Sequence, residues 1–186
     1  LENKVPPRSF ECIRKTIESE TGLQLKEIFE SIDPIPLGSA SIGQVHEAVL
    51  RKDGTGENGK AATPTKNRRV AIKVQYPEAQ TLFQGDMRTI RSMCEYLAPE
   101  QMVMLTAIEK QNATELDYTH EEANLRTVHE NMKRHGFMPR QVVVPMPIPL
   151  PRAPAKQPPT LVLALELLPG QKLIDGIHDY WRVWAK

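Results

Sequence analysis

A short loop that contains two glycines and leads directly into an alternating apolar stretch constrains this chain more than any other feature. The stretch reads PLGSASIGQVHEAVL, residues 36–50, and the pattern from Val45 to Leu50 predicts a strand. Walker A loops and dinucleotide-binding loops both lead into a helix, whose N-terminus holds the phosphates. Gln44 and Val45 also occupy the positions where a Walker A loop has Lys followed by Ser or Thr. The sequence therefore disfavours both of these phosphate loops.

The glycine-rich loop of protein kinases, G-x-G-x-x-G-x-V, fits the stretch better because it lies between two strands. In that template a hairpin folds over the phosphates of the nucleotide. Its eight positions are Gly38, Ser39, Ala40, Ser41, Ile42, Gly43, Gln44 and Val45. Only the second glycine differs, since the chain has Ala40 there. Taken alone, the loop could also be an ordinary hairpin turn.

The kinase template also requires a lysine in the sequence V-A-I-K, on the strand that follows the loop hairpin. Residues 70–73 read Val-Ala-Ile-Lys, within the stretch RVAIKVQY. Val70, Ile72 and Val74 alternate with polar or small residues, which predicts a half-buried strand. Lys73 could simply face solvent. Two kinase-like motifs in the right order, on consecutive predicted strands, favour a lysine that contacts phosphates.

A phosphate lysine needs an acidic partner from a helix, and the stretch ELDYTHEEANL, residues 115–125, is the best source. Asp117 and Glu121 are one turn apart on a helix and would share a face. Glu115 would lie about 200° around from Asp117 on an ideal helix. These two acids therefore diverge unless a helix begins or bends between them. A charged, solvent-exposed helix face is the alternative interpretation.

Hydrophobic periodicity and helix-breaking residues predict the remaining elements. Helices are expected over residues 9–19, with Gly22 as the stop signal, and over residues 23–32, 80–98 and 101–134, and an amphipathic helix begins near residue 173. The stripe of the third helix consists of Phe83, Met87, Ile90, Cys94 and Leu97. Residues 51–69 form a polar solvent hairpin or a disordered insertion, and the proline-rich residues 138–159 form an extended, partly polyproline connector. A buried strand follows within residues 160–168.

Charge and cysteine content exclude several classes of protein. Lys and Arg total 24 against 23 acidic residues, a net charge of +1, so the sequence makes no electrostatic case for nucleic-acid binding. The two cysteines, Cys12 and Cys94, lack metal-ligand spacing and are expected to be buried thiols. No apolar run approaches the roughly 18 residues that a transmembrane helix needs.

Four stretches taken together resemble the UbiB/aarF-domain family of atypical kinase-like proteins. They are PLGSASIGQVHEAVL, VAIKVQYPEA, ELDYTHEEAN and LVLALELLPGQKL, in this order, and the resemblance covers nearly the whole chain. Members of this family resemble protein kinases in fold, carry an alanine-rich loop that ends in S-I-G-Q-V-H, and insert helices between the lysine strand and the acid-bearing helix. Gly38 and Ser39 depart from the alanine run, which leaves the nucleotide preference open.

The resemblance implies an α+β fold in which a protein-kinase-like N-lobe, a small antiparallel sheet with its glycine/alanine-rich loop, carries extra N-terminal and inserted helices. We expect the chain to stop before the catalytic C-lobe. The implied organisation is a helical extension (1–34), lobe strands with the polar insertion (35–76), a helical insertion with the acid-bearing helix (77–134), the proline-rich connector (135–160), and the hinge strand with the start of the C-lobe (161–186).

The resemblance also assigns roles to individual residues. Ala40 to His46 would form the nucleotide loop, and Lys73 would contact phosphates while paired with Glu121. Glu115 and Asp117 match the E-x-D acids of the family, and Glu166 would lie at the hinge that binds adenine, chiefly through backbone groups. The implied catalytic set is Lys73, Glu121, Glu115 and Asp117. The implied nucleotide-binding set is Gly38, Ser39, Ala40, Ser41, Ile42, Gly43, Val45, Lys73 and Glu166.

The expected ligand is ATP or ADP, and Mg²⁺ is expected only together with the C-lobe. The family's K-x-G-Q motif would lie upstream of Leu1, and the catalytic loop and metal-binding Asp would lie downstream of Lys186, so this chain by itself should not turn over ATP. The resemblance implies a role in coenzyme Q biosynthesis or lipid homeostasis, in mitochondria or alternatively in plastids or at bacterial membranes. Contacts with a membrane surface, lipid or quinone-biosynthesis proteins would follow.

Two other functions stay open at this point. The chain could be a pseudokinase-like scaffold in which nucleotide binding regulates protein or lipid contacts. It could also be a helical interaction module in which the hairpin has no ligand.

Overall fold

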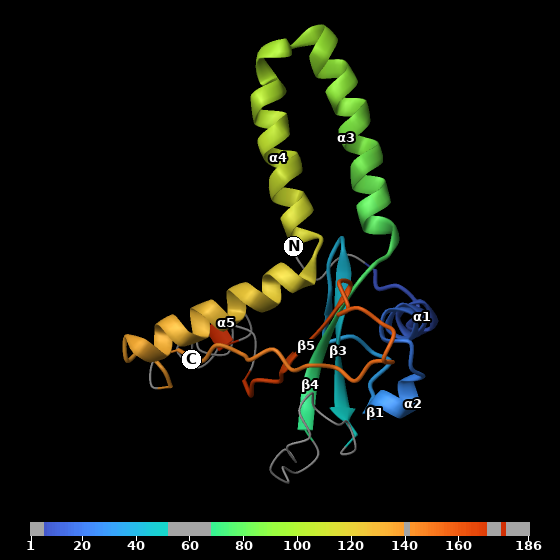
Figure 1. Cartoon of the computed structure of the whole chain (residues 1–186), viewed down its shortest axis with the longest axis vertical. Helices are drawn as coiled ribbons and strands as arrows, with labels where there is room; N and C mark the ends of the chain where they lie inside the picture. Colours follow the sequence, from blue (N-terminus) through green and yellow to red (C-terminus); the bar gives the residue numbers. More distant parts are fainter. Residues whose placement is uncertain (1–5, 52–67, 140–141, 171–175, 178–186) are drawn as a thin grey trace, which may run out of the picture.

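An antiparallel sheet of five strands organises the computed structural model, which describes residues 6–51, 68–139, 142–170 and 176–177 (Figure 1). The strands are β1 (Phe29–Ile32), β2 (Gly38–Ser39), β3 (Gly43–Leu50), β4 (Arg68–Gln75) and β5 (Val162–Glu166). Their order is β1-β3-β4-β5, and β2 pairs with the start of β3. This small antiparallel sheet with helices confirms the predicted α+β class. The polar insertion lies almost entirely outside the described residues, as does most of the predicted helix at residues 173–186.

The two long central strands form because their apolar residues alternate. Val70, Ile72 and Val74 of β4 are fully buried, whereas the side chains of Ala71 and Lys73 point to the other face. The register pairs Gly43 of β3 with Gln75 and continues without a bulge to Leu50 and Arg68. The sheet therefore has one face that packs on the hydrophobic core and one face that carries Lys73.

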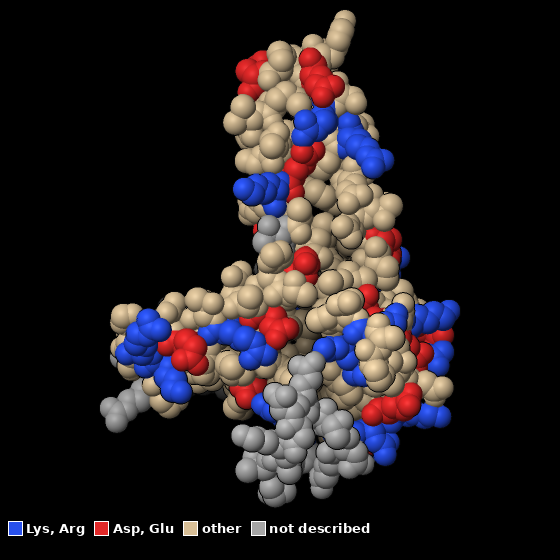
Figure 2. All heavy atoms as spheres, viewed as in Figure 1, with Lys and Arg blue, Asp and Glu red and all other residues tan. Residues whose placement is uncertain are grey.

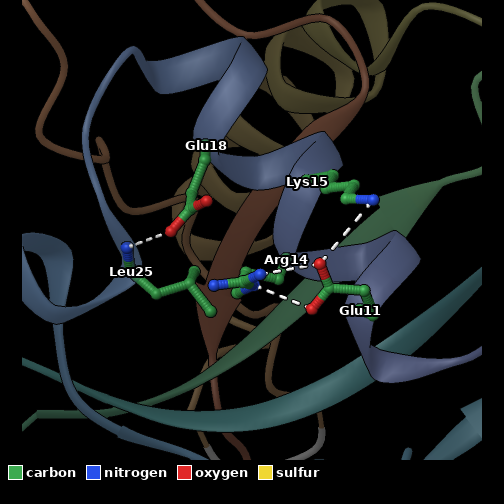
Figure 3. Close-up of polar contacts among 5 residues, drawn as sticks. All are labelled: Glu11, Arg14, Lys15, Glu18 and Leu25. Carbon is green, nitrogen blue, oxygen red and sulfur yellow. Dashed lines mark hydrogen bonds and ion pairs between the residues drawn. The ribbon is translucent and has the colours of Figure 1, made fainter.

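Helix α1 (Phe10–Thr21) covers the core face of the sheet, where Ile13 and Ile17 are fully buried. It ends at Gly22, which adopts a left-handed conformation with φ 72°, as the sequence predicts. Its exposed side carries Glu11, whose carboxylate binds Arg14 and Lys15 (Figure 3). The Glu18 carboxylate accepts a hydrogen bond from the Leu25 N–H at 3.0 Å and so fixes the start of α2 (Leu25–Ile28).

Two sequence predictions for this region are wrong. The helix expected over residues 23–32 ends at Ile28, and Phe29–Ile32 forms β1, because pairing with β3 overrides the local helical pattern. Cys12 and Cys94 are free thiols, but both are half-buried rather than buried.

The proline-rich segment lies along the outer edge of β5. The Ile148 N–H donates to Ala164 O at 2.8 Å, and Pro147 forms an isolated antiparallel bridge with Leu165. Ile148 and Leu150 are buried in the core. A proline has no backbone N–H to donate to a neighbouring strand. It is therefore excluded from inner strands but tolerated at a sheet edge. Residues 142–153 of this segment contain no helix and run along the sheet edge, in agreement with the prediction of an extended chain, and the segment also completes one side of the core.

Helices α3 (Glu78–Leu97) and α4 (Met102–Glu115), joined by a short 3-10 helix (Pro99–Gln101), form a hairpin that projects away from the sheet (Figure 1). Phe83, Met87 and Cys94 of the predicted stripe are half-buried, whereas Ile90 and Leu97 are exposed, and no residue of α3 is buried. Uncharged side chains cover most of the hairpin face visible in Figure 2. An ion pair between Arg91 and Glu109 joins the two helices.

The single helical region predicted over residues 101–134 is interrupted. Helix α4 ends at Glu115, and α5 (Tyr118–Arg134) begins three residues later in a different direction (Figure 1). Asp117 is the N-cap of α5, with an extended backbone at φ −122° and ψ 106°. Its carboxylate accepts hydrogen bonds from the Thr119 N–H at 2.9 Å and the Thr119 hydroxyl at 2.6 Å. The chain therefore breaks between the two acids whose directions diverge on a continuous helix.

Candidate nucleotide site

The centre of the candidate site is an ion pair between Lys73 of β4 and Glu121 of α5. The Lys73 Nζ and Glu121 Oε2 atoms are 2.6 Å apart, although the two residues are separated by 48 positions in sequence. The side chains are 31% and 36% exposed, so the ammonium group stays accessible to a ligand. The structure thus brings together the lysine and the acid that the sequence predicts to be partners.

Tyr118 holds Lys73 from a second side. The Lys73 Nζ lies 4.6 Å from the centre of the Tyr118 ring, within the range of a cation–π interaction. Tyr118 is 2% exposed, and its N–H donates to Thr160 O at 3.0 Å, which ties the start of α5 to the chain leading into β5. Burial, together with the charge of Glu121, raises the pKa of Tyr118, so its hydroxyl stays protonated. The ammonium is therefore fixed by one carboxylate and one aromatic face.

The loop closes tightly over the end of β4. Gly38 pairs with Val45 and Ser39 with Gln44, and the Ala40 N–H donates to Gly43 O at 2.8 Å. The Tyr76 N–H donates to Ile42 O at 2.8 Å and so pins the loop to the residue that follows β4. The loop is thus a strand–turn–strand hairpin, the arrangement that the kinase template requires.

At position 43 the loop has no room for any residue other than glycine. A Cβ atom there would lie 2.5 Å from Val74 O and 3.2 Å from the Tyr118 hydroxyl. The phenol of Tyr118 therefore fills the space that a side chain at Gly43 would need. This contact connects the loop to the residue that supports Lys73.

The two E-x-D acids make their described contacts away from Lys73. Glu115, the last residue of α4, accepts a hydrogen bond from Gln111 Nε2 at 3.2 Å. Asp117 caps α5, and its carboxylate lies 4.0 Å from His120 Nε2. Their catalytic role stays a prediction, since their present contacts are those of a helix end and a helix cap.

Glu166 is the last residue of β5, next to the edge segment. Its carboxylate accepts hydrogen bonds from Arg68 Nη2 at 3.0 Å and from the Met146 N–H at 3.2 Å. Its own N–H donates to Met146 O at 3.0 Å. The side chain thus holds the edge segment on the sheet, and the adenine-binding role of this residue stays a prediction.

Sequence patterns do not identify two residues that lie beside Lys73. Gln75 and Tyr118 lie on the same side of the sheet as Lys73, and both are buried. A glutamine on the polar side of a strand, such as Gln75, is typical of an ordinary solvent-facing residue. Tyr118 lies in a stretch whose acidic residues carry the sequence signal. Their positions depend on the packing of α5 against β4, which no local pattern reveals.

The described residues contain no group of three or more His, Cys, Asp or Glu side chains arranged to hold a metal ion. Nor does any helix in the described ranges have the length and apolar character needed to cross a membrane.

Comparison with known proteins agrees with this geometry. The chain is 28% identical over 181 residues to an uncharacterised protein of Synechocystis. The aligned region covers 93% of this chain and 27% of that protein. It is 30% identical over 143 residues to the AarF domain-containing protein kinase 1 of Gallus gallus, with coverages of 74% and 25%. It is 31% identical over 98 residues to the probable protein kinase UbiB of Aeromonas hydrophila, with coverages of 53% and 16%. The chain therefore spans only a small part of each of these relatives.

A solved structure shares the fold. The chain superposes on Rv3197 of Mycobacterium tuberculosis, from its complex with erythromycin, with a TM-score of 0.68 and 26% identity, covering 93% of this chain and 39% of Rv3197. The family model of the ABC1 atypical kinase-like domain matches residues 1–176. With the loop, the lysine strand and the acid-bearing helix in the kinase-like arrangement, this chain belongs to the ABC1 atypical kinase-like family, whose named members here include AarF domain-containing kinases and UbiB.

Proposed function

We propose that this chain is the nucleotide-binding part of a UbiB-type atypical kinase or ATPase. The observation that carries the proposal is the 2.6 Å ion pair between Lys73 and Glu121 beside the loop that ends at Gly43. In protein kinases, a strand lysine paired with a helix glutamate positions the phosphates of ATP, and catalysis then depends on charge stabilisation. The partly exposed Lys73 ammonium and the small residues of the loop suit an anionic ligand of this kind.

In this proposal ATP or ADP binds under the loop formed by residues 38–46, with its phosphates at Lys73. Glu121 keeps the ammonium in position, and Glu166 borders the adenine through its backbone. Glu115 and Asp117 approach the phosphates when the C-lobe and Mg²⁺ complete the site. The metal would supply charge neutralisation, and this chain alone would bind nucleotide without turning it over.

The process served by the full-length protein would be coenzyme Q biosynthesis or lipid homeostasis, and its location would be mitochondrial. A plastid location is the alternative, supported by two Arabidopsis thaliana relatives that carry the word chloroplastic in their names. The corresponding partners would be a membrane surface, a lipid or a protein of quinone biosynthesis.

One observation supports the alternative of a pseudokinase-like scaffold. The end of the α3–α4 hairpin exposes large apolar side chains, among them Tyr96 at 87%, Val103 at 82% and Leu97 at 70%. Exposed apolar patches of this kind mark contact surfaces for proteins or membranes. In a scaffold, nucleotide binding would regulate such contacts instead of supporting phosphoryl transfer.

Thermal unfolding of the full-length protein with and without MgATP or MgADP tests nucleotide binding. A ligand that binds only the folded state, at a hundred times its dissociation constant, stabilises by about 2.7 kcal/mol. We expect the unfolding midpoint to rise, and Lys73→Ala to abolish the rise. The matched control is Arg69→Ala, because Arg69 lies on the same strand and forms an ion pair of the same length, 2.6 Å, with Glu47. This control should keep the ligand-induced rise.

Each result has a definite meaning. Absence of any shift in the parent protein would contradict nucleotide binding, and an equal loss in both variants would show a general effect of breaking a strand ion pair. If Lys73→Ala abolishes nucleotide binding while cellular function is retained, the scaffold alternative becomes the better explanation.

A further inference from the structure

Two glutamines and two tyrosines near the end of β4 differ sharply in their hydrogen bonding. Gln44 and Tyr76 are bonded to each other, since the Tyr76 hydroxyl donates to Gln44 Oε1 at 2.8 Å. Gln44 Oε1 also accepts from the Arg8 N–H at 2.9 Å, and its Nε2 lies 2.8 Å from His46 Nε2. This network lies against α1, where the Phe10 ring contacts the His46 ring, and it is a satisfied part of the core.

The side chains of Gln75 and Tyr118 are buried equally deeply but form no hydrogen bond among the residues that the structure describes. Gln75 is 1% exposed, yet its Oε1 and Nε2 both lack a partner. Tyr118 is 2% exposed, and its hydroxyl also lacks one. Buried polar groups in native proteins almost always have partners, because leaving them unpaired is costly. Three such atoms in two neighbouring residues therefore require an explanation.

All three unpaired atoms belong to the surroundings of Lys73. Gln75 is two residues beyond Lys73 on β4, so the two side chains point to the same face of the sheet. The Tyr118 ring lies under the Lys73 ammonium at 4.6 Å. The Tyr118 hydroxyl and the Gln75 Cα each lie 3.2 Å from the point where a Cβ of Gly43 would be. The Tyr118 hydroxyl and the backbone of Gln75 thus lie against the end of the loop, in residues that adjoin the lysine.

We propose that Gln75 and Tyr118 are positioning residues that donate hydrogen bonds to phosphate oxygens of the nucleotide bound at Lys73. The Gln75 amide has two N–H donors and the Tyr118 hydroxyl has one, while phosphate oxygens only accept, so the phosphates would pair with two of the three atoms, Gln75 Nε2 and the Tyr118 hydroxyl. Because both groups are buried in this structure, the phosphates reach them when the turn at residues 40–42 opens and releases the hydrogen bond from the Tyr76 N–H to Ile42 O, while Gly43 stays paired with Gln75. This inference rests on the proposed nucleotide-binding function and names the side chains, besides Lys73, that hold the phosphates.

The test uses variants that remove only the polar atoms, in the full-length protein. Gln75→Leu and Tyr118→Phe keep the volume of each side chain, and Tyr118→Phe also keeps the ring under Lys73. The matched control is Tyr76→Phe, which makes the same chemical change as Tyr118→Phe in the satisfied network. Dissociation constants for MgATP, MgADP and adenosine are measured together with the unfolding midpoint without ligand.

The two variants and the control should respond in opposite ways. Gln75→Leu and Tyr118→Phe should weaken MgATP and MgADP binding about tenfold or more, leave adenosine binding unchanged, and keep or raise the midpoint without ligand. Tyr76→Phe should lower the midpoint, because it removes one of the two hydrogen bonds that the buried Gln44 Oε1 accepts, and should leave all dissociation constants unchanged.

Several outcomes would overturn the inference. Unchanged MgATP and MgADP binding in both Gln75→Leu and Tyr118→Phe, with a parent that binds nucleotide, would show that these groups do not contact the ligand. An equal loss of adenosine binding would remove the assignment to phosphate, and a lowered midpoint like that of Tyr76→Phe would make the residues purely structural. A parent that binds no nucleotide would overturn the proposed function itself, which is a different result.

Discussion

Gly43 shows at the scale of one residue how closely the loop approaches the lysine strand. A Cβ at this position would lie 2.5 Å from a backbone oxygen, Val74 O, which cannot move aside as a flexible side chain would. We expect Gly43→Ala to lower the free energy of unfolding by about 1–3 kcal/mol through overpacking. Gly85→Ala is the control, because a Cβ there meets nothing within 4 Å in the interior of α3.

Gly85→Ala should instead stabilise the protein by about 0.5–1 kcal/mol, since alanine favours a helix interior more than glycine does. Urea denaturation of both variants measures the two effects. If Gly43→Ala were as stable as the parent, the close approach between the loop and β4 would not be a feature of the protein in solution.

His46 links the stability of the core to pH. It is fully buried, and burial lowers its pKa below the ordinary value, although its Nδ1 lies 2.7 Å from Asp33 O. Between this lowered pKa and about 6.5, the unfolded chain holds a proton on His46 that the folded chain does not. The contribution of His46 to stability is therefore complete above about pH 6.5 and is lost as the pH falls below that value.

We expect the unfolding midpoint of the parent to fall more steeply on acidification than that of His46→Gln, which has no titrating group at this position. Midpoints measured from about pH 8 down to about pH 5 give the comparison. Parallel profiles for the two proteins would show that His46 does not titrate in this range. The slope of the midpoint against pH shows whether His46 titrates, even if the substitution lowers the midpoint at every pH.

The sequence was most informative for residues whose chemistry follows from a local pattern. Lys73 lies on a strand whose alternation is visible in VAIKV, and Glu121 was found because a phosphate lysine needs an acid from a helix. Gln75 and Tyr118 could not be found in this way, because their lack of partners exists only after α5 packs against β4. A pattern thus identifies the charged pair but not the neutral groups around it.

At the scale of elements, the break between α4 and α5 decides how the acid-bearing helix meets the sheet. Asp117 produces this break as the N-cap of α5, with bonds to the Thr119 N–H and hydroxyl. Loss of an N-cap costs about 1 kcal/mol. We expect Asp117→Ala to destabilise the protein by this amount, and Asp117→Asn to retain most of the stability because asparagine is an equally good cap.

The same two variants separate the structural role of Asp117 from its proposed catalytic role. If the carboxylate serves only as a cap, full-length Asp117→Asn should keep the activity of the parent. If it also acts at the phosphates, Asp117→Asn should be stable but impaired. Denaturation and activity measured on one preparation of each variant distinguish these cases, and equal stability of Asp117→Ala and the parent would contradict the cap itself.

Element boundaries were predictable where one local signal dominates and unpredictable where pairing decides. Gly22 ends α1 as expected, because a left-handed glycine stops a helix. Phe29–Ile32 follows a helical turn and carries no alternation strong enough to predict a strand, and it becomes β1 because β3 offers an unpaired edge. The sequence allowed for the split between α4 and α5, because Glu115 and Asp117 diverge on a continuous helix unless a helix begins or bends between them.

At the scale of the whole molecule, the sheet packs on a core of buried apolar residues, whereas the α3–α4 hairpin buries almost no apolar residue among those described. The core joins α1, the sheet and the edge segment around residues such as Ile17, Ile72 and Ile148. In contrast, α3 has no buried residue, and within α4 Leu105 is the buried apolar residue among those described. Segments with few buried apolar contacts open at lower free energy than the global unfolding transition.

Hydrogen exchange under native conditions should therefore show two levels of protection. Amides of β3 and β4 should exchange only with global unfolding, whereas amides in the middle of α3 and α4 should exchange through a local opening of the hairpin. Gly43→Ala makes the test sharp, because the three nearest atoms that its Cβ would meet belong to Val74, Gln75 and Tyr118, none of which lies in the hairpin. It should speed exchange in β3 and β4 and leave exchange in the hairpin unchanged, since a local opening of the hairpin does not open the sheet. If the substitution speeds exchange in both regions equally, the hairpin and the sheet unfold as one cooperative unit, and any partner that holds the hairpin would stabilise the proposed nucleotide site directly.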